Sequence, residues 1–188
     1  MSEPQGSGRP PRTAVCTIVS NNYLPFARTL MGSLREIHPE WDRHVLITDE
    51  IRGLFDPQGE DFAVLEAGEL PLPGGQRFLF RYSILELNTA VKPWWLAWLF
   101  ERGDYDRVIY LDPDIFLYRK LEEVEEALDA GSLMCLTPHL TGRLSAEHKP
   151  NETDILRAGA YNLGFIALSR HPDLAGFLAW WQSKMEFD

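Results

Sequence analysis

The sequence lacks several features that would assign it to a specialised class of protein. It has 2 cysteines, Cys16 and Cys135, and no cluster of cysteine and histidine with the spacing of a zinc site. Because both cysteines lie in apolar runs, we expect buried free thiols in a reducing compartment. No apolar run is long enough to cross a bilayer, and the N-terminal residues lack the apolar segment of a signal peptide. These absences predict a cytoplasmic protein, and a peripheral position on a membrane stays open.

Positive charge is also scarce. The chain has 18 lysines and arginines against 28 aspartates and glutamates, which gives a net charge of -10 at pH 7. A broad nucleic-acid-binding face needs clustered positive charge, so no nucleic-acid partner is expected. A small polyanionic ligand is still compatible with this composition, because a metal ion or one lysine can offset its charge locally.

Apolar residues are abundant in the rest of the chain. Hydrophobic residues make up 45% and aromatic residues 12% of 188 positions, which is enough for one domain with a sizeable core. Residues 1–12 are polar and rich in glycine and proline, so we expect a flexible tail there. Residues 13–188 are predicted to form a single domain.

Apolar strand-like runs alternate with helical patterns along this domain. The first helix is predicted from a stripe of Phe26, Leu30, Leu34 and Ile37, and a longer helix with a break near Pro93 is predicted over 77–103. The alternation predicts an α/β fold with a mostly parallel sheet flanked by helices. Ligands bind such sheets outside the carboxyl ends of the strands. Six strands are expected, in the segments TAVCTIVS, RHVLITDE, FAVLEA, YDRVIYLD, SLMCLTP and AYNLGFIALS.

Two carboxylates follow the fourth of these strands, in the segment VIYLDPDIFLY. If the chain stays extended there, Asp112 and Asp114 point to the same side of the sheet. Two ionised carboxylates beside an apolar strand are costly unless something compensates their charge. A divalent cation would do so, and oxygen ligands suit Mg²⁺ or Mn²⁺. The alternative is a solvated turn, since aspartate and proline are common turn residues.

A different chemistry uses a similar motif. Phosphatases of the haloacid dehalogenase type have a nucleophilic aspartate in D-x-D-x-T/V after an apolar strand. Here Phe116 occupies the final position, and the strand is the fourth rather than an early one. Both departures rank the phosphatase interpretation below metal binding.

The chain resembles GT-A-fold, nucleotide-sugar-dependent glycosyltransferases, and within them the glycosyltransferase family 8 type and related bacterial enzymes. The resemblance is carried by ELNTAVKPWWLAWLFERGDYDRVIYLDPDIFLY and by GAYNLGFIAL, and it extends from Thr13 to the C-terminus. It implies a GT-A, Rossmann-like sheet. It also implies transfer of a sugar from a nucleotide-diphosphate sugar, with a UDP-sugar expected, to a glycan, lipid or protein acceptor. Retention of anomeric configuration is the outcome that family 8 favours.

The resemblance also implies roles for individual residues. Asp112 and Asp114 match the D-x-D motif that binds Mn²⁺ or Mg²⁺ and, through it, the donor diphosphate. Tyr23 would stack on the nucleotide base, and Asn21 or Asn22 would donate hydrogen bonds to base and ribose. Tyr23 could instead be a hydrophobic staple at the start of a helix.

Four more positions take expected donor-site roles from the resemblance. Asp49 would reach the base, and Lys92 would neutralise the diphosphate or pair with an aspartate. Asn162 and Gly164 match an N-x-G turn near the donor sugar, where glycine permits close backbone approach. Lys92 could instead be a solvated lysine at a helix end. Asn162 could instead satisfy a backbone group at a strand end.

The chain departs from the family pattern at its C-terminus. Family 8 enzymes carry a third metal ligand, a histidine in a late motif, and this sequence has no such motif. We therefore expect a fragment or a truncated form, with transferase activity in doubt. The alternative function is a non-catalytic nucleotide-sugar or glycan-binding module. A nucleotidyltransferase ranks lower, because VSNNYLPF has none of the glycines that such enzymes place after the first strand.

Overall fold

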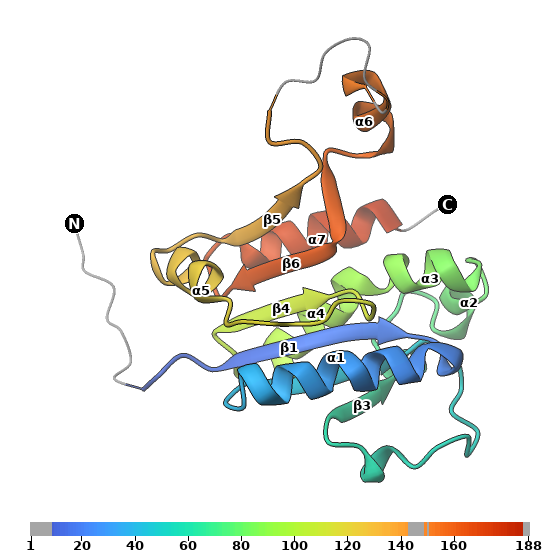
Figure 1. Cartoon of the computed structure of the whole chain (residues 1–188). Helices are drawn as coiled ribbons and strands as arrows, with labels where there is room; N and C mark the ends of the chain where they lie inside the picture. Colours follow the sequence, from blue (N-terminus) through green and yellow to red (C-terminus); the bar gives the residue numbers. More distant parts are fainter. Residues whose placement is uncertain (1–8, 143–148, 150, 186–188) are drawn as a thin grey trace.

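The computed structural model describes residues 9–142, 149 and 151–185, and its elements are labelled in Figure 1. Its strands are β1 (Thr13–Val19), β2 (Asp42–Ile47), β3 (Ala63–Glu66), β4 (Arg107–Leu111), β5 (Met134–Pro138) and β6 (Tyr161–Ser169). Its α-helices are α1 (Leu24–Ile37), α2 (Gln76–Leu79), α3 (Ile84–Ala90), α4 (Lys92–Arg102), α5 (Glu122–Asp129), α6 (Glu152–Ala158) and α7 (Leu174–Met185). Short 3₁₀ helices are η1 (Asn21–Tyr23), η2 (Pro57–Gly59) and η3 (Ala67–Glu69).

The six predicted strands form one sheet in the order β3-β2-β1-β4-β6-β5. β1, β2, β3 and β4 are parallel, while β6 runs antiparallel to both β4 and β5. The chain leaves β1 toward β2 and β3 on one side and later places β4 on the other side of β1. The order therefore reverses between β1 and β4, and a ligand crevice is expected at their carboxyl ends.

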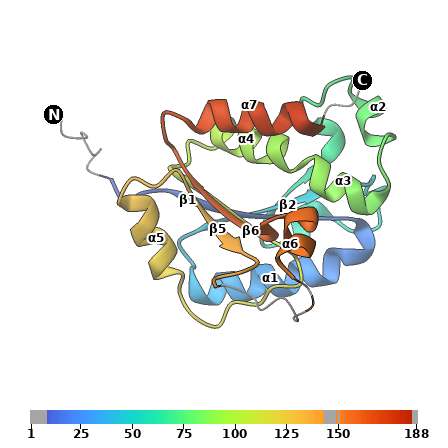
Figure 2. The same cartoon turned by 90° about the horizontal axis from the view of Figure 1, so that it is seen from above.

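Helices cover both faces of the sheet, with α4 and α7 on one face and α1 and α5 on the other (Figure 2). Alternate residues of β1 divide between the two apolar clusters. Cys16 and Ile18 face α4, while Val15 and Val19 face α1. Because side chains alternate along a strand, a strand covered on both faces needs an unbroken apolar run. The apolar runs seen in the sequence are therefore continuous because helices cover both faces of the strands.

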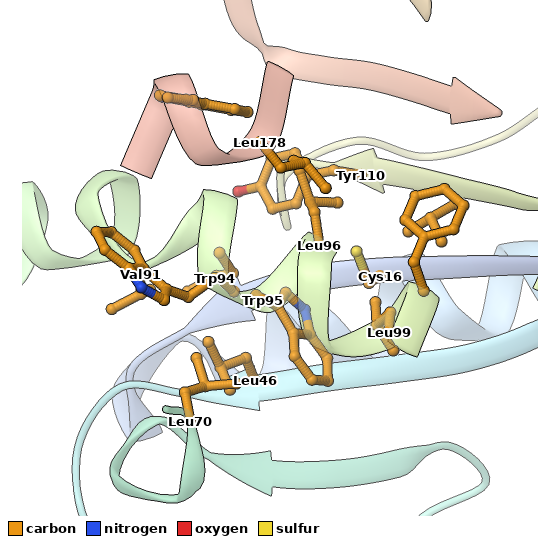
Figure 3. Close-up of a cluster of buried hydrophobic side chains, with 14 of the residues drawn as sticks. Cys16, Leu46, Leu70, Val91, Trp94, Trp95, Leu96, Leu99, Tyr110 and Leu178 are labelled. Carbon is orange, nitrogen blue, oxygen red and sulfur yellow. The ribbon is translucent and has the colours of Figure 1, made fainter. Parts of the chain in front are cut away.

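The cluster on the α4 side gathers large side chains from distant parts of the chain (Figure 3). Trp95 lies fully inside this cluster, which also contains Cys16 of β1 and Tyr110 of β4. Both cysteines are free thiols, as expected; Cys16 is buried as predicted, whereas Cys135 is only partly buried.

The structure corrects three expectations about helices. The helix predicted over 77–103 with a break near Pro93 is three helices. Val91 separates α3 from α4 close to the predicted break, and a second break, which was not predicted, precedes Ser83, where a capping box begins α3. Phe26, placed in the buried stripe of the first helix, is 49% exposed. Helix α6 was not predicted, and it begins at a capping box formed by Asn151 and Asp154.

The predicted tail includes residue 12, and Arg12 contacts the domain rather than extending freely from it. Thr13 begins β1, where the sequence placed the domain boundary. The guanidinium of Arg12 pairs with Asp42 at 2.8 Å, and its backbone N–H donates to Asp106. Residues 1–8 of the predicted tail lie outside the described residues. Within the described ranges, no helix has the length and apolar character needed to cross a membrane.

Gly103 offers a test of packing at the end of α4. A Cβ built there would lie 1.9 Å from the Tyr105 ring, and that ring is held by a 2.8 Å hydrogen bond to His44. We expect Gly103→Ala to lower the free energy of unfolding by about 1–3 kcal/mol, the usual cost of overpacking. Urea denaturation measures this value.

The matched control is Gly32→Ala in α1, where no atom lies within 4 Å of the added methyl group. There alanine should leave stability unchanged or raise it by roughly 0.5–1 kcal/mol, through lower backbone entropy in the unfolded chain. Equal effects of the two substitutions would contradict the packing described for Gly103.

Candidate functional site

A cavity of about 380 Å³ opens at the carboxyl ends of β1 and β4, where the strand order reverses. One wall is formed by the end of β1 and by η1, and the opposite wall by α3 and the first residue of α4. The end of β4 and the segment around Leu163 of β6 complete it. The lining side chains that the sequence singled out are Asn22, Tyr23, Lys92, Asp112 and Asp114.

The two aspartates do not follow an extended chain. Strand β4 ends at Leu111, and the carbonyl of Asp112 accepts a 3.1 Å hydrogen bond from the backbone N–H of Ile115. Asp112 to Ile115 therefore form a turn with Pro113 at its second position. The turn foreseen as the alternative is present, and both carboxylates nevertheless line the cavity.

The carboxylate of Asp112 is held from two sides. Its Oδ1 accepts a 2.7 Å hydrogen bond from the hydroxyl of Tyr110. Its Oδ2 faces Gly164, where an added Cβ would lie only 2.8 Å away. Its backbone N–H donates to the carbonyl of Gly164 at 2.8 Å. The start of β6 therefore packs directly against this acidic side chain.

Only glycine fits at position 164 without movement of its neighbours, because a Cβ there would lie 2.8 Å from oxygens of Asp112 and Asn162. Its backbone N–H donates to Oδ1 of Asn162 at 2.7 Å, so Asn162 satisfies a backbone group at the start of β6. The sequence placed this N-x-G segment near a donor sugar. The structure places Gly164 against Asp112. Leu163, which lies between Asn162 and Gly164 in the sequence, lines the cavity.

Lys92 is buried, with 3% of its surface exposed, so it is not a solvated lysine at a helix end. Its Nζ donates to the carbonyl of Leu163 at 2.9 Å and lies 3.9 Å from the centre of the Tyr110 ring. Burial lowers the pKa of Lys92 to about 8, against the opposing attraction of Asp112. The cavity therefore holds a lysine whose charge is poorly solvated.

Burial has the opposite effect on Tyr110. It raises the pKa of this phenol well above its usual value, and the nearby Asp112 adds to the shift. Tyr110 therefore stays a protonated hydrogen-bond donor at neutral pH.

The residues after β1 divide between two hollows. Asn22 and Tyr23 line the cavity, and Ser20 donates its hydroxyl hydrogen to Oδ1 of Asn22. Tyr23 is 47% exposed, and its ring stacks on Phe26 at 5.2 Å. An exposed ring at the rim is free to accept a further stacking partner.

Asn21 and Asp49 instead take part in hydrogen bonds between the loop after β1 and the loop after β2. The backbone N–H of Asn21 donates to Asp49 at 2.9 Å, and its Nδ2 donates to the carbonyl of Glu50 at 2.8 Å. Both residues line a separate, more open hollow next to the cavity, with Leu54 and Phe55. These contacts tie the loop after β1 to the loop after β2.

Sequence reasoning missed the wall formed by α3. Ile84, Leu85, Asn88 and Thr89 line the cavity. Oδ1 of Asn88 accepts a 2.8 Å hydrogen bond from the hydroxyl of Thr48, which follows β2. The available signal was the four-residue spacing of Asn88 and Lys92, because residues so spaced share one face of a helical segment.

In the described part of the chain, no group of three or more histidine, cysteine, aspartate or glutamate side chains is arranged to hold a metal ion. The acidic residues that line this cavity are Asp112 and Asp114. The third ligand that the family 8 pattern implies is therefore not found among the described residues.

Comparisons with known proteins agree on the fold. No protein-family model matches the chain, and a search of curated proteins gives no match. The solved structures do match. The galactosyltransferase LgtC, in complex with donor and acceptor sugar analogs, aligns over 92% of this chain with 19% identity and a TM-score of 0.54.

Two further solved structures give the same result. Glycosyltransferase GlyE of Streptococcus pneumoniae TIGR4 aligns over 93% of this chain with 16% identity and a TM-score of 0.50. Mouse xyloside xylosyltransferase 1 aligns over 92% with 12% identity and a TM-score of 0.51. This chain spans 64% of the LgtC chain, 36% of the GlyE chain and 73% of the xylosyltransferase chain. The chain therefore has the GT-A-type fold of these glycosyltransferases, as the sequence predicted.

Proposed function

We propose that this chain binds a nucleotide-diphosphate sugar, with a UDP-sugar the expected donor, and takes part in transferring its sugar to a glycan, lipid or protein acceptor. The observation that carries the proposal is the convergence of Lys92, Asp112 and Asp114 on one cavity at the strand-order reversal of a GT-A-type fold. A lysine and two carboxylates facing one small cavity suit a ligand that is itself anionic and arrives with a cation.

The acidic pair fits a divalent cation such as Mn²⁺ or Mg²⁺. Mg²⁺ commonly takes one or two protein carboxylates together with phosphate oxygens, so two aspartates are a sufficient protein contribution. Tyr110 donates one hydrogen bond to Oδ1 of Asp112, and lone pairs of the carboxylate that this bond does not use would bind the cation. When bound, the cation would supply positive charge that stabilises the diphosphate as the bond to the sugar breaks.

The remaining roles belong to groups of the chain itself. Lys92 would stabilise negative charge on the departing diphosphate from a site shielded from water. Tyr23 would present its exposed ring to the base, and Asn22 would donate its amide hydrogens, because its Oδ1 is already bonded to Ser20. Retention of configuration is the expected outcome, following the family 8 resemblance.

A non-catalytic nucleotide-sugar or glycan-binding module is the second candidate. It is favoured by the acidic site, which has two carboxylates rather than three ligands among the described residues. The two candidates separate in calorimetry. Metal-dependent binding of UDP supports the transferase site, whereas metal-independent binding of free oligosaccharide alone supports the module.

The first prediction concerns Asp114. We expect Asp114→Ala to weaken Mn²⁺-dependent binding of UDP by more than about 100-fold, beyond the 10–100-fold that loss of an outer-shell group typically costs. Isothermal calorimetry with UDP and Mn²⁺ measures this change. Asp173→Ala, which removes an exposed carboxylate beside α7, is the control and should bind as the unaltered chain does. Unchanged binding by Asp114→Ala would exclude the metal role.

The second prediction concerns Gly164. A methyl group there would lie 2.8 Å from Oδ2 of Asp112, so the carboxylate must move. We expect Gly164→Ala to weaken Mn²⁺-dependent UDP binding roughly 10–100-fold, as loss of support for a ligand does. Gly176→Ala in α7, with no atom within 4 Å of its methyl group, is the matched control. Equal affinities for the two variants would show that Asp112 needs no such support.

The third prediction concerns the cost of burying Lys92. The folded chain holds the pKa of Lys92 at about 8, below its usual 10.5, so the unfolded chain binds more protons between these values. Stability should therefore rise with pH across that window, by about 3 kcal/mol from this group at about 1.36 kcal/mol per pKa unit. Below pH 8 the buried charge is a net destabilising feature.

Lys92→Met removes this charge. We expect the variant to gain stability relative to the unaltered chain at pH 7 and to lose that advantage by pH 10, while its UDP affinity at pH 7 falls at least about tenfold, which corresponds to about 1.4 kcal/mol. Urea denaturation at both pH values and calorimetry at pH 7 measure these effects. Lys120→Met, at an exposed site, is the control. A constant stability difference across the pH range would contradict the burial argument.

A further inference from the structure

Tyr110 occupies a position where an apolar residue would be expected. It lies in the middle of β4, paired with Cys16 of β1 and Ile166 of β6, and only 2% of its surface is exposed. Its ring packs with the buried apolar cluster on the α4 side, where Figure 3 shows it beside Leu178 and Leu96. A phenylalanine would supply the same ring, so the hydroxyl group needs a separate explanation.

We propose that Tyr110 is a positioning residue whose hydroxyl fixes the orientation of the Asp112 carboxylate at the cavity. This inference rests on the proposed function, in which Asp112 serves a metal-bound nucleotide diphosphate. It assigns Tyr110 no contact with the ligand.

The contacts of Asp112 carry the first step. Oδ1 accepts the 2.7 Å hydrogen bond from Tyr110, and Oδ2 lies beside the space that Gly164 leaves open. The backbone of Asp112 is fixed by its hydrogen bond to Gly164. With the backbone and one oxygen both held, the carboxylate cannot rotate freely about its Cβ–Cγ bond. The carboxylate is then presented in a constant direction.

The contacts of Lys92 carry the second step. Its Nζ lies 3.9 Å from the centre of the Tyr110 ring and is held there by the carbonyl of Leu163. A cation over a ring face is attracted by the electrons of the ring, and this attraction does not need the hydroxyl group. Removing only the hydroxyl should therefore disturb Asp112 and leave Lys92 in place.

A purely structural role for the hydroxyl predicts something different. A buried Tyr hydroxyl needs a partner, and Asp112 could serve only to satisfy it. In that case Tyr110→Phe would change stability alone. A positioning role predicts a change in metal-dependent binding, because groups that hydrogen-bond a metal-ligating carboxylate tune the metal affinity.

The test is Tyr110→Phe in the full chain. Mn²⁺ is titrated into protein with UDP at a fixed concentration, and UDP is titrated separately in EDTA, both by calorimetry. We expect the Mn²⁺ concentration for half-saturation to rise about 10–100-fold, while UDP affinity in EDTA stays within about twofold. Thermal unfolding of both proteins shows that the variant is folded. Tyr118→Phe, at a site 86% exposed and outside the cavity, is the control and should match the unaltered chain.

Each outcome decides the proposal. An unchanged Mn²⁺ requirement in Tyr110→Phe, with Mn²⁺-dependent UDP binding intact in the unaltered chain, overturns the positioning role and leaves the proposed function standing. An equal loss of UDP affinity with Mn²⁺ and in EDTA also overturns it, because the hydroxyl would then act on Lys92 or on packing. Failure of the unaltered chain to bind UDP with Mn²⁺ overturns the proposed function and the positioning role together.

Discussion

The backbone of β6 approaches the end of β4 so closely that no side chain fits between Gly164 and Asp112. This approach depends on strand direction. Because β6 runs antiparallel to β4, its first residues lie at the carboxyl end of β4, and Asp112 bonds to Gly164 there. A parallel neighbour would have its first residues at the opposite edge of the sheet. The antiparallel strand therefore supplies a wall of the cavity that the parallel part of the sheet cannot supply.

The same segment of β6 also fixes the lysine on the other side of the cavity. The carbonyl of Leu163 accepts from Lys92, and Tyr110 lies under the ammonium group. Lys92 and Tyr110 thus place polar groups at the edge of an apolar cluster, where they are tolerated because each has partners. Residues that serve a ligand at such a place reduce stability when the ligand is absent, and natural proteins accept that loss at functional sites.

Much of this architecture could be predicted from the sequence. The six strands and the carboxyl-end location of the acidic pair follow from apolar periodicity and from the general rule for parallel sheets. These features depend on patterns that repeat over many residues. The break near Pro93 was predicted, but the break before Ser83 was missed because the capping box there begins a new helix within an otherwise continuous helical pattern. Phe26 was misplaced because an apolar residue at helical spacing can also lie at an exposed rim.

The site residues were harder to predict, for a physical reason. Asn21 and Asp49 lie 28 positions apart, and only the pairing of β1 with β2 brings their loops into hydrogen-bonding contact. Asn88 of α3 lies in the cavity wall and accepts a hydrogen bond from Thr48, which follows β2 and is 40 positions away in the sequence. In the sequence, Tyr110 could not be distinguished from the apolar residues of its strand, because the proposed role depends on its hydroxyl group and apolar periodicity does not register that group. Contacts of this kind are decided by the tertiary arrangement and leave no periodic signal.

The acceptor side is where a transferase and a binding module differ. Sugar transfer requires that water be kept from the bond that breaks, and an open cavity edge does not do this. Around this cavity Leu85 is 77% exposed and Leu163 is 44% exposed, alongside the exposed ring of Tyr23. Apolar side chains at the rim of a polar cavity favour a cover that is itself partly apolar, whether an acceptor or another part of a longer chain. Under the proposed function, the charged residues of the cavity would bind the donor in either protein, and what closes over the rim would decide between them.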